Sequence, residues 1–297
     1  MPQASMQQAA NIYSRLAPHP PRPPRETTSR AGRNLPLAVA TAAVLLTIVG
    51  ASLVFRIEIF VALAVLCLTM ALWEAAGALL ARDFRIPFPV LALGQALMLV
   101  ATWKYSLGVA FLVLLGVFAV TTAATLVIKR QGALTDALAG CFTVSWLGLL
   151  GCFAVAMAKM DHPALVIVTF ILLPVANDTG GWCAGVLLGK HPIAASISPK
   201  KSWEGFVGSV VLSLLVAIVM AGIVLKISWI WVIVLAVATP IAATAGDFAE
   251  SLVKRDLGVK DMGAIFPGHG GVLDRIDSML FCAPVCYLVF ALGFGLL

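Results

Sequence analysis

Long apolar stretches run through most of this chain, and short segments that carry charge separate them. Of its 297 residues, 61% are hydrophobic and only 11% are charged, whereas a typical soluble domain is about half apolar and about a quarter charged. An apolar helix of about 20 residues crosses the hydrocarbon core of a bilayer. The sequence therefore predicts an all-α polytopic integral membrane protein and excludes an ordinary soluble domain.

The apolar stretches predict about nine transmembrane helices. The turn at Arg56 is short, and the span near 88–102 falls below the roughly 20 residues of an untilted crossing, so the first four spans are the least sharply bounded. The predicted spans are 36–52, 57–80, 88–102, 106–128, 133–157, 164–188, 205–225, 229–250 and 276–296.

The composition divides the chain into three regions. Residues 1–35 hold many prolines, small polar residues and five arginines, which predicts a disordered cytoplasmic tail. Residues 36–160 are predicted to form the N-terminal transmembrane helices. Residues 161–297 are predicted to form the C-terminal transmembrane helices together with two polar loops that carry the sequence motifs.

The Lys and Arg residues support this topology. Cytoplasmic loops of membrane proteins carry an excess of these residues. With the N-terminus in the cytoplasm, 16 of the 20 Lys and Arg residues fall in inside segments. The outside turns hold only Arg56, Lys104, Lys159 and Lys226. The pattern predicts a multi-pass protein of the cell membrane with loops 189–204 and 251–275 in the cytoplasm, and it accounts for the net charge of +6 without nucleic acid.

The second of these loops, SLVKRDLGVKDMGAIFPGHGGVLDRID from Ser251 to Asp277, concentrates polar chemistry between two apolar stretches. If Asp274 opens a helix, Asp274 and Asp277 lie on one face, where two carboxylates suit Mg²⁺ that also contacts phosphate. Neighbouring glycines let backbone amides approach phosphate oxygens, and Lys254 and Arg255 supply positive charge. Basic residues placed only by topology would leave the aspartates and glycines unexplained.

This loop resembles the complete signature of the phosphatidate cytidylyltransferases, also called CDP-diacylglycerol synthases. The resemblance covers roughly the second half of the chain, and a long, spaced signature is far more specific than a short glycine pattern. Asn177 with Asp178, the run SPKKSWEG from Ser198 to Gly205, and GDFAES from Gly246 to Ser251 also resemble family motifs. The matching signature residues are Ser251, Lys254, Arg255, Lys260, Asp261, Gly263, Pro267, His269, Gly270, Gly271, Asp274, Arg275 and Asp277.

The resemblance implies a catalytic C-terminal half with a polar cavity that faces the cytoplasm. It implies that CTP and phosphatidate of the cytoplasmic leaflet give CDP-diacylglycerol and pyrophosphate, with Mg²⁺, a second cation such as K⁺, and a homodimer. Asp247, Asp274 and Asp277 correspond to the metal-binding aspartates, and with Lys254 and Arg255 they form the predicted catalytic set. The predicted substrate-binding residues are Asn177, Asp178, Ser198, Lys200, Lys201, Glu204, Ser251, Lys260, Asp261, His269, Gly270, Gly271 and Arg275.

Carboxylates inside apolar stretches point to the same region, because a charge in hydrocarbon is costly unless it is paired, solvated or bound to metal. Asp178 precedes Thr179, Gly180 and Gly181, where a break in the helix would open a polar cavity. Glu74 and Asp136 are expected to be buried structural partners of neighbouring helices. Ser202 and Glu204 are candidates to cap the helix that follows them.

Other functions remain as alternatives at this stage. A membrane cytidylyltransferase that uses an ether-lipid phosphate would share the same site. A secondary transporter would show matching interrupted spans in two repeated halves, and the sequence has no second copy of the segment 177–181. A scaffold protein would leave the aspartates and glycines without a role. The six cysteines lie scattered in apolar spans, so neither disulfides nor zinc are expected.

Overall fold

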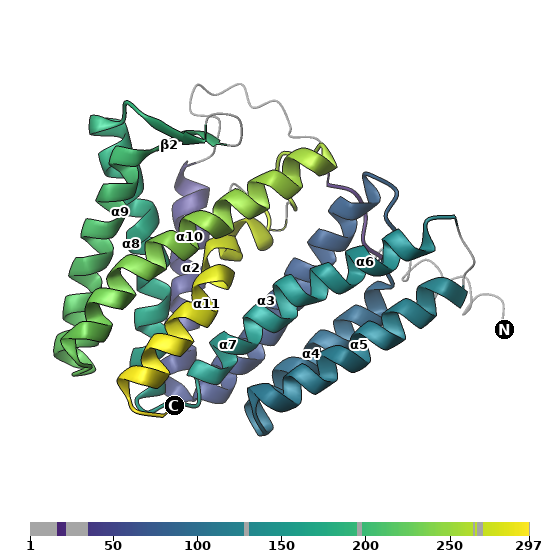
Figure 1. The fold of residues 1–297 in the computed structure, drawn as a ribbon, viewed down its shortest axis with the longest axis horizontal. Helices are drawn as coiled ribbons and strands as arrows, with labels where there is room; N and C mark the ends of the chain where they lie inside the picture. The colour runs from purple at the N-terminus through teal and green to yellow at the C-terminus, as the bar shows by residue number, and fades with distance from the viewer. Residues whose placement is uncertain are drawn as a thin grey trace.

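A computed structural model of the chain describes residues 17–21, 35–127, 131–194, 198–263, 265 and 270–296, with the backbone alone at 35–42, 199 and 200. The described part is a bundle of long helices that lie side by side (Figure 1). The helices are α2 (Leu35–Phe55), α3 (Ile57–Leu80), α4 (Phe88–Lys104), α5 (Leu107–Val127), α6 (Ala133–Val144), α7 (Leu150–Met157), α8 (Pro163–Leu188), α9 (Trp203–Val216), α10 (Trp229–Leu257) and α11 (Leu273–Gly293).

Short π-helical turns join some of these helices into longer rods. Ser145–Leu149 connects α6 to α7, and Ala217–Val224 extends α9. Within the described residues, seven segments are long and apolar enough to cross a membrane, namely Ile57–Leu80, Leu107–Val127, Ala133–Met157, Pro163–Leu188, Trp203–Val224, Trp229–Leu257 and Leu273–Gly293. Ala43–Phe55 and Phe88–Lys104 are shorter apolar helices. These helices confirm the prediction of an all-α protein with several segments that are long and apolar enough to cross a membrane.

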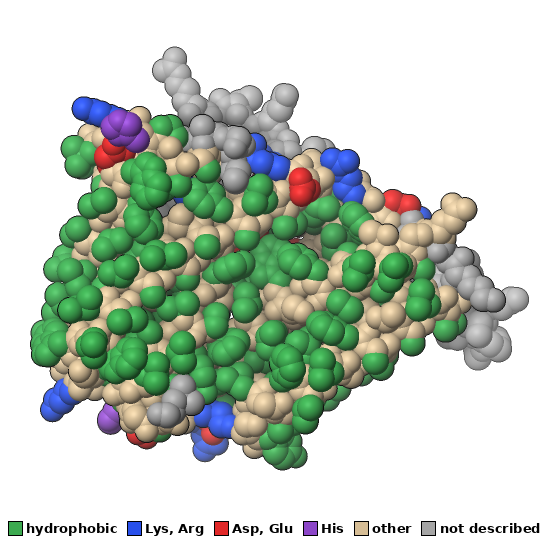
Figure 2. All heavy atoms as spheres, viewed as in Figure 1, with side chains coloured by type: hydrophobic (Ala, Val, Ile, Leu, Met, Phe, Trp, Pro, Cys, Tyr) green, Lys and Arg blue, Asp and Glu red, His purple; other side chains and the backbone are tan. Residues whose placement is uncertain are grey.

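Charged side chains gather at two opposite ends of the bundle, and hydrophobic side chains cover the face between them (Figure 2). Large apolar residues such as Leu112, Val207 and Ile233 are more than half exposed on this surface. A soluble protein rarely exposes so wide an apolar surface. This distribution is the one expected of helices that are surrounded by lipid.

The bundle has two groups of helices with a pair between them. α8 packs closely along α9, and α3 to α7 form the opposite group (Figure 1). α10 and α11 lie against each other between these groups, where α11 contacts both α7 and α8. The motif-bearing helices therefore form the centre of the structure.

A two-stranded antiparallel hairpin connects α8 to α9, and the sequence analysis did not foresee it. Its strands are β1 (Pro192–Ala194) and β2 (Ser198–Ser202). The hairpin lies at one end of the bundle (Figure 1). It carries most of the run from Ser198 to Gly205, so the basic residues of that run stand on a strand and not on an unstructured loop.

Three helices contain a proline in their interior, among the residues that the structure describes. These are Pro174 in α8, Pro240 in α10 and Pro284 in α11. A proline inside a helix removes one backbone hydrogen bond and favours a bend. The same three helices carry Asp178, Asp247, Asp274 and Asp277.

Glu74 and Asp136, two buried carboxylates outside the predicted site, have backbone partners, as expected. Asp136 accepts a hydrogen bond from the backbone N–H of Arg85 at 2.8 Å. Glu74 of α3 accepts one from Leu273 at the start of α11 at 2.9 Å. Each carboxylate therefore joins segments that are distant in the sequence.

Residues 17–21 of the N-terminal region lie against α3. The ring of His19 meets Trp73 edge-on, with ring centroids 5.0 Å apart. A β-carbon on Gly77 would lie only 2.4 Å from the backbone oxygen of His19, so the glycine permits this close approach. Most of the tail predicted for residues 1–35 lies outside the described residues.

Candidate active site

The last turns of α10 carry polar side chains on one face. Asp247, Glu250 and Lys254 follow one another at intervals of three and four residues, which places them in line along a helix. Glu250 is 1% exposed, and Lys254 forms an ion pair with it. Because a buried charge needs a partner, the two residues stabilise each other inside the bundle.

Asp274 closes the loop that follows α10 and begins the next helix. α11 starts at Leu273 with Asp274 in its first turn, so the prediction that Asp274 opens a helix is confirmed. Its carboxylate accepts hydrogen bonds from the backbone N–H groups of Gly271 at 2.9 Å and Met262 at 3.1 Å. It also accepts one from Lys254 Nζ at 3.0 Å. Asp274 therefore ties both ends of the loop to α10.

Asp277 lies one turn further along α11 and faces α10. Its side chain is buried and interacts electrostatically with Asp247 and Glu250. Gly246 permits the two helices to approach closely here. A β-carbon at this position would lie only 2.8 Å from the backbone oxygen of Asp277. Asp247, Glu250 and Asp277 thus gather three carboxyl groups between α10 and α11.

Lys201 brings positive charge from the hairpin to this cluster. Its Nζ forms an ion pair with Asp247 of α10 and lies 5.2 Å from the centre of the Phe248 ring. Both members of the pair are partly exposed, at 30% for Lys201 and 20% for Asp247. The pair therefore lies where a ligand from solvent can reach it.

The start of α9 is fixed to the hairpin by two side chains. Ser202 accepts a hydrogen bond from the backbone N–H of Gly205 at 3.1 Å, which confirms its predicted role as a cap. Glu204 does not share that role. Its carboxylate accepts from the backbone N–H groups of Lys190 and His191 at 3.1 and 3.2 Å and lies 2.5 Å from His191 Nδ1. Glu204 thus joins the end of α8 to the start of α9.

Asn177 and Asp178 lie on an unbroken helix. α8 continues from Pro163 to Leu188, so the break expected at 177–181 is wrong. Asn177 Nδ2 donates to Asp178 Oδ1 at 3.0 Å, and Ser209 Oγ of α9 donates to the backbone oxygen of Asn177 at 2.6 Å. Both α8 and α9 are therefore continuous where they pack together at Asn177 and Ser209.

Glycines explain how α8 and α9 come so close. A β-carbon on Gly180 would lie 2.4 Å from the backbone oxygen of Gly208, and one on Gly208 would lie 2.4 Å from Cβ of Ala184. Small residues at such crossings let helix backbones pack tightly in membranes. The glycines at 180 and 181 therefore serve helix contact and not a helix break.

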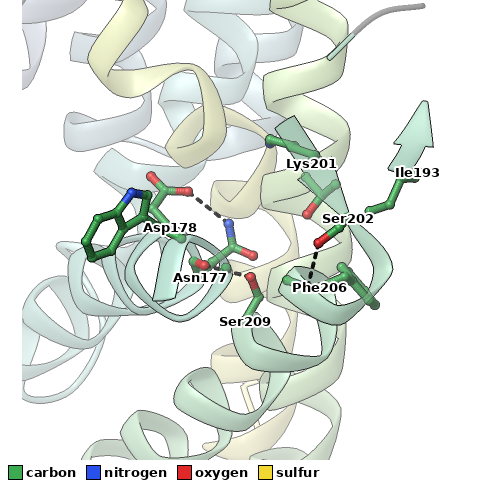
Figure 3. Close-up of a pocket in the computed structure, with 11 residues that line it drawn as sticks. Asn177, Asp178, Ile193, Lys201, Ser202, Phe206 and Ser209 are labelled. Atoms are coloured by element: carbon green, nitrogen blue, oxygen red, sulfur yellow. Dashed lines mark hydrogen bonds between the residues drawn. The ribbon is translucent and has the colours of Figure 1, made fainter. Parts of the chain in front are cut away.

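A cavity of about 210 Å³ lies between α8, the hairpin and α9 (Figure 3). Asn177 and Asp178 of α8 lie in contact with each other in it, and Lys201 of the hairpin lines it as well. Its wall is largely apolar, and Asp178 is within electrostatic range of Asp247 and Arg275. The cavity is lined by Asn177, Asp178, Gly181, Trp182, Ile193, Lys201, Ser202, Gly205, Phe206, Ser209 and Thr244.

The donor atoms of the cluster suit a hard cation. Asp247, Glu250 and Asp277 supply carboxylate oxygens, which Mg²⁺ prefers, and Oε1 of buried Glu250 has no hydrogen-bond partner. Within the described ranges, however, no three His, Cys, Asp or Glu side chains converge as a formed metal site. Lys201 contacts Asp247 and Lys254 contacts Asp274. The three predicted metal aspartates lie in the same region of the structure, but their carboxylates do not converge on a single point where a metal ion would bind.

Other predicted residues lie around the cluster. Ser251 and Asp261 are half-buried, and Arg255, Lys260 and Arg275 are exposed. Gly270 adopts a φ of 83°, which favours glycine, and Gly271 donates to Asp274. His269 and the side chain of Lys200 lie outside the described residues, and Ser198 stands on β2.

Sequence reasoning missed several residues at this site. Glu250 stands one turn after Asp247 within GDFAES, so helical spacing was a sufficient signal for it. Ser209 and Thr244 reach the cavity from helix interiors. No local pattern distinguishes them from other small polar residues in apolar helices.

Comparison with known protein sequences identifies the family of this chain. The family model described as "Cytidylyltransferase family" matches residues 37–292. A phosphatidate cytidylyltransferase of Mycobacterium leprae is 34% identical over 291 residues, which cover 90% of this chain and 91% of that protein. The phosphatidate cytidylyltransferase of Mycobacterium tuberculosis strain H37Rv is 34% identical, covering 91% of this chain and 86% of the other. That of Bacillus subtilis is 31% identical over 60% of this chain and 68% of its own length. This chain belongs to the cytidylyltransferase family.

Proposed function

We propose that this protein is a phosphatidate cytidylyltransferase, which converts CTP and phosphatidate into CDP-diacylglycerol and pyrophosphate for phospholipid biosynthesis. One observation carries the proposal. Lys201 forms an ion pair with Asp247, and Lys254 forms ion pairs with Glu250 and Asp274, at one end of apolar helices. These neighbouring cations and carboxylates suit a reaction between a polyphosphate from water and a phosphate on a lipid. The names of the relatives described above support the same activity.

The proposed topology has nine transmembrane helices, with the N-terminus and the motif loops in the cytoplasm of a bacterial cell. The helices α2 and α4 add to the seven long apolar segments. Each crossing reverses the direction of the chain, so the hairpin and the loop after α10 share one side. The excess of Lys and Arg in the inside segments supports this orientation. CTP is available on that side.

Asp247, Asp274 and Asp277, together with Glu250, are the residues that would hold Mg²⁺. A bound Mg²⁺ supplies charge neutralisation to phosphate oxygens. A second cation such as K⁺ is part of the proposal, since the cluster contains more carboxylates than one magnesium ion requires from protein. Carboxylate oxygens are the donors that both ions accept.

The basic residues have a distinct part in the proposed reaction. Lys201 and Lys254 lie beside the carboxylates, and Arg275 is near Asp178. These cations offset the repulsion between two anionic substrates. An oxygen of the phosphatidate phosphate forms a bond to the α-phosphorus of CTP, and the bond from that phosphorus to the bridging oxygen breaks. The electron pair leaves with pyrophosphate.

The cavity walls fit a substrate that stays partly in the membrane. Trp182 and Phe206 line the cavity beside Asp178 and Lys201, and Trp182 is 70% exposed on the surface of α8. We propose that phosphatidate enters sideways, with its phosphate at Lys201 and its acyl chains in the bilayer. A homodimer is also proposed, from the family resemblance.

The decisive test measures pyrophosphate release by the protein purified in detergent, with CTP, Mg²⁺ and phosphatidate. The wild type is expected to release pyrophosphate only when lipid is present, and Asp277→Asn is expected to lose at least about a hundredfold in rate. Asp136→Asn neutralises a buried carboxylate away from the cluster and should keep its activity.

The same assay distinguishes the alternative lipid. Ester-linked and ether-linked phosphatidates are compared side by side at equal concentration. Faster release with the ester lipid supports the proposal, and release with the ether lipid alone would replace it by the ether-lipid reaction. A folded wild type that releases nothing with either lipid would rule the proposed function out.

A further inference from the structure

A carboxylate from the N-terminal half of the chain reaches the motif loop. Glu74 of α3 is 1% exposed, and its Oε2 accepts a hydrogen bond from the backbone N–H of Leu273 at 2.9 Å. These residues are 199 positions apart. Leu273 immediately precedes Asp274, so Glu74 contacts the backbone beside a proposed metal ligand.

Two glycines of the loop are shaped around this carboxylate. A β-carbon on Gly263 would lie 2.0 Å from Glu74 Oε1, and one on Gly271 would lie 2.6 Å from Glu74 Oε2. Any side chain at either position would displace the carboxylate. The two glycines therefore bring both described ends of the loop onto Glu74.

Backbone amides surround the carboxylate at the same place. The amides of Val272 and Ile265 lie near Glu74 in addition to that of Leu273. Negative charge at the first turn of a helix is favourable because the backbone N–H groups there lack helical partners. Glu74 thus supplies from α3 the acceptor that the start of α11 requires.

Asp274 depends on the same backbone. It accepts hydrogen bonds from Gly271 and Met262 and from Lys254. Gly271 and the neighbour of Met262, Gly263, are the two residues in closest approach to Glu74. A shift of the loop away from Glu74 would therefore move the groups that orient Asp274.

We propose that Glu74 is a positioning residue of the active site, which holds residues 263, 265 and 271–273 on α3 so that Asp274 faces Lys254. The inference rests on the proposed function for its effect on catalysis. It assigns a role in the site to a residue outside the C-terminal signature. It also gives a physical reason for glycine at positions 263 and 271.

The test compares Glu74→Gln with Asp136→Asn. Both substitutions neutralise a buried carboxylate that accepts a hydrogen bond from a distant backbone N–H, that of Leu273 at 2.9 Å for Glu74 and that of Arg85 at 2.8 Å for Asp136. In Glu74→Gln the amide group brings N–H donors toward backbone N–H donors, so the loop should move. We expect kcat to fall between about tenfold and a hundredfold, because small misplacements of reacting groups are costly. The KM for phosphatidate should change less than about twofold.

Two readouts separate positioning from a general loss of stability. The Mg²⁺ concentration for half-maximal rate should rise in Glu74→Gln and stay constant in Asp136→Asn. Hydrogen exchange of peptides that cover 258–263 and 270–276 should quicken by about tenfold in Glu74→Gln without substrate or metal, while exchange in α8 and α9 stays as in the wild type.

The outcomes are distinct for the two proposals. If wild-type protein is active and Glu74→Gln matches it in kcat, Mg²⁺ dependence and loop exchange, Glu74 has no positioning role. If the wild type is inactive, the proposed function fails, and the exchange measurement still decides whether Glu74 holds the loop. Should Glu74→Gln fail to fold, Gly263→Ala places a methyl group against the carboxylate and should give the same loop exchange and Mg²⁺ shift. Normal behaviour of Gly263→Ala would overturn the inference.

Discussion

Lys201 of the hairpin forms an ion pair with Asp247 of α10, 46 residues later in the sequence. The pair connects the cavity between α8 and α9 with the carboxylates between α10 and α11. Lys201 lines the cavity beside Asp178. A substrate phosphate that enters this cavity would therefore contact Lys201 before the carboxylates of α10 and α11. The hairpin is thus part of the proposed site and not only a connection between helices.

Lys201→Met should retain the fold and lose activity. The substitution keeps an unbranched apolar side chain but removes the charge, and a cation that offsets developing phosphate charge is worth about a hundredfold or more in rate. Steady-state kinetics of pyrophosphate release measure the effect. Lys190→Met changes an exposed lysine just before the hairpin and is the matched control. Equal rates for the two variants would contradict a role for Lys201.

Asp277→Asn should lose activity without losing stability. Asp277 is buried near Asp247 and Glu250, and removal of one of several close carboxylates relieves repulsion between like charges. Functional sites often keep such unfavourable arrangements at the expense of stability. Thermal unfolding in detergent without Mg²⁺ should therefore give a Tm equal to or above that of the wild type. A clear fall in Tm would show that Asp277 stabilises the fold.

Gly180→Ala should disturb the cavity by separating α8 from α9. The added methyl group would lie 2.4 Å from the backbone oxygen of Gly208, and overpacking of this kind typically costs about 1–3 kcal/mol. We expect a lower Tm and a reduced rate. Gly116→Ala in α5 is the control, since a β-carbon there meets nothing within 4 Å, and alanine is the better helix former by about 1 kcal/mol. Similar losses in both variants would contradict the argument from packing.

Gly77→Ala should release the N-terminal segment 17–21 from α3. The new β-carbon would lie 2.4 Å from the backbone oxygen of His19, and α3 itself should tolerate alanine well. A nitroxide label at Ala17→Cys, in a background without the native cysteines, should become more mobile by electron paramagnetic resonance. His19→Ala removes the ring contact with Trp73 but leaves the backbone contact, so its effect should be smaller. Unchanged mobility in Gly77→Ala would show that the segment adapts.

The sequence predicted the helices well because their apolar runs dominate it. The predicted span 57–80 matches α3, and 133–157 matches the rod from α6 to α7. Hydropathy placed the last span at 276–296, whereas α11 begins at Leu273, because the first turn of α11 carries charge. For the same reason α10 extends to Leu257 beyond the predicted end at residue 250.

The members of the site were partly predictable, and their partners were not. Local spacing identified Asp274 and Asp277, and it contained enough information to add Glu250. The contacts of Lys201 with Asp247 and of Glu74 with Leu273 join residues far apart in the sequence. Such pairs depend on how helices pack, and no local pattern records that packing. The hairpin escaped prediction because its strands are three and five residues long.

The interior prolines mark the positions at which the three helices of the site bend most easily. Within α8, α10 and α11, Pro174 lies four residues from Asp178, Pro240 lies seven residues from Asp247, and Pro284 lies seven residues from Asp277. A helix resists bending least where its ladder of hydrogen bonds is interrupted. If the segments that bear these aspartates move when a substrate binds, the three prolines are the positions at which we expect the helices to bend.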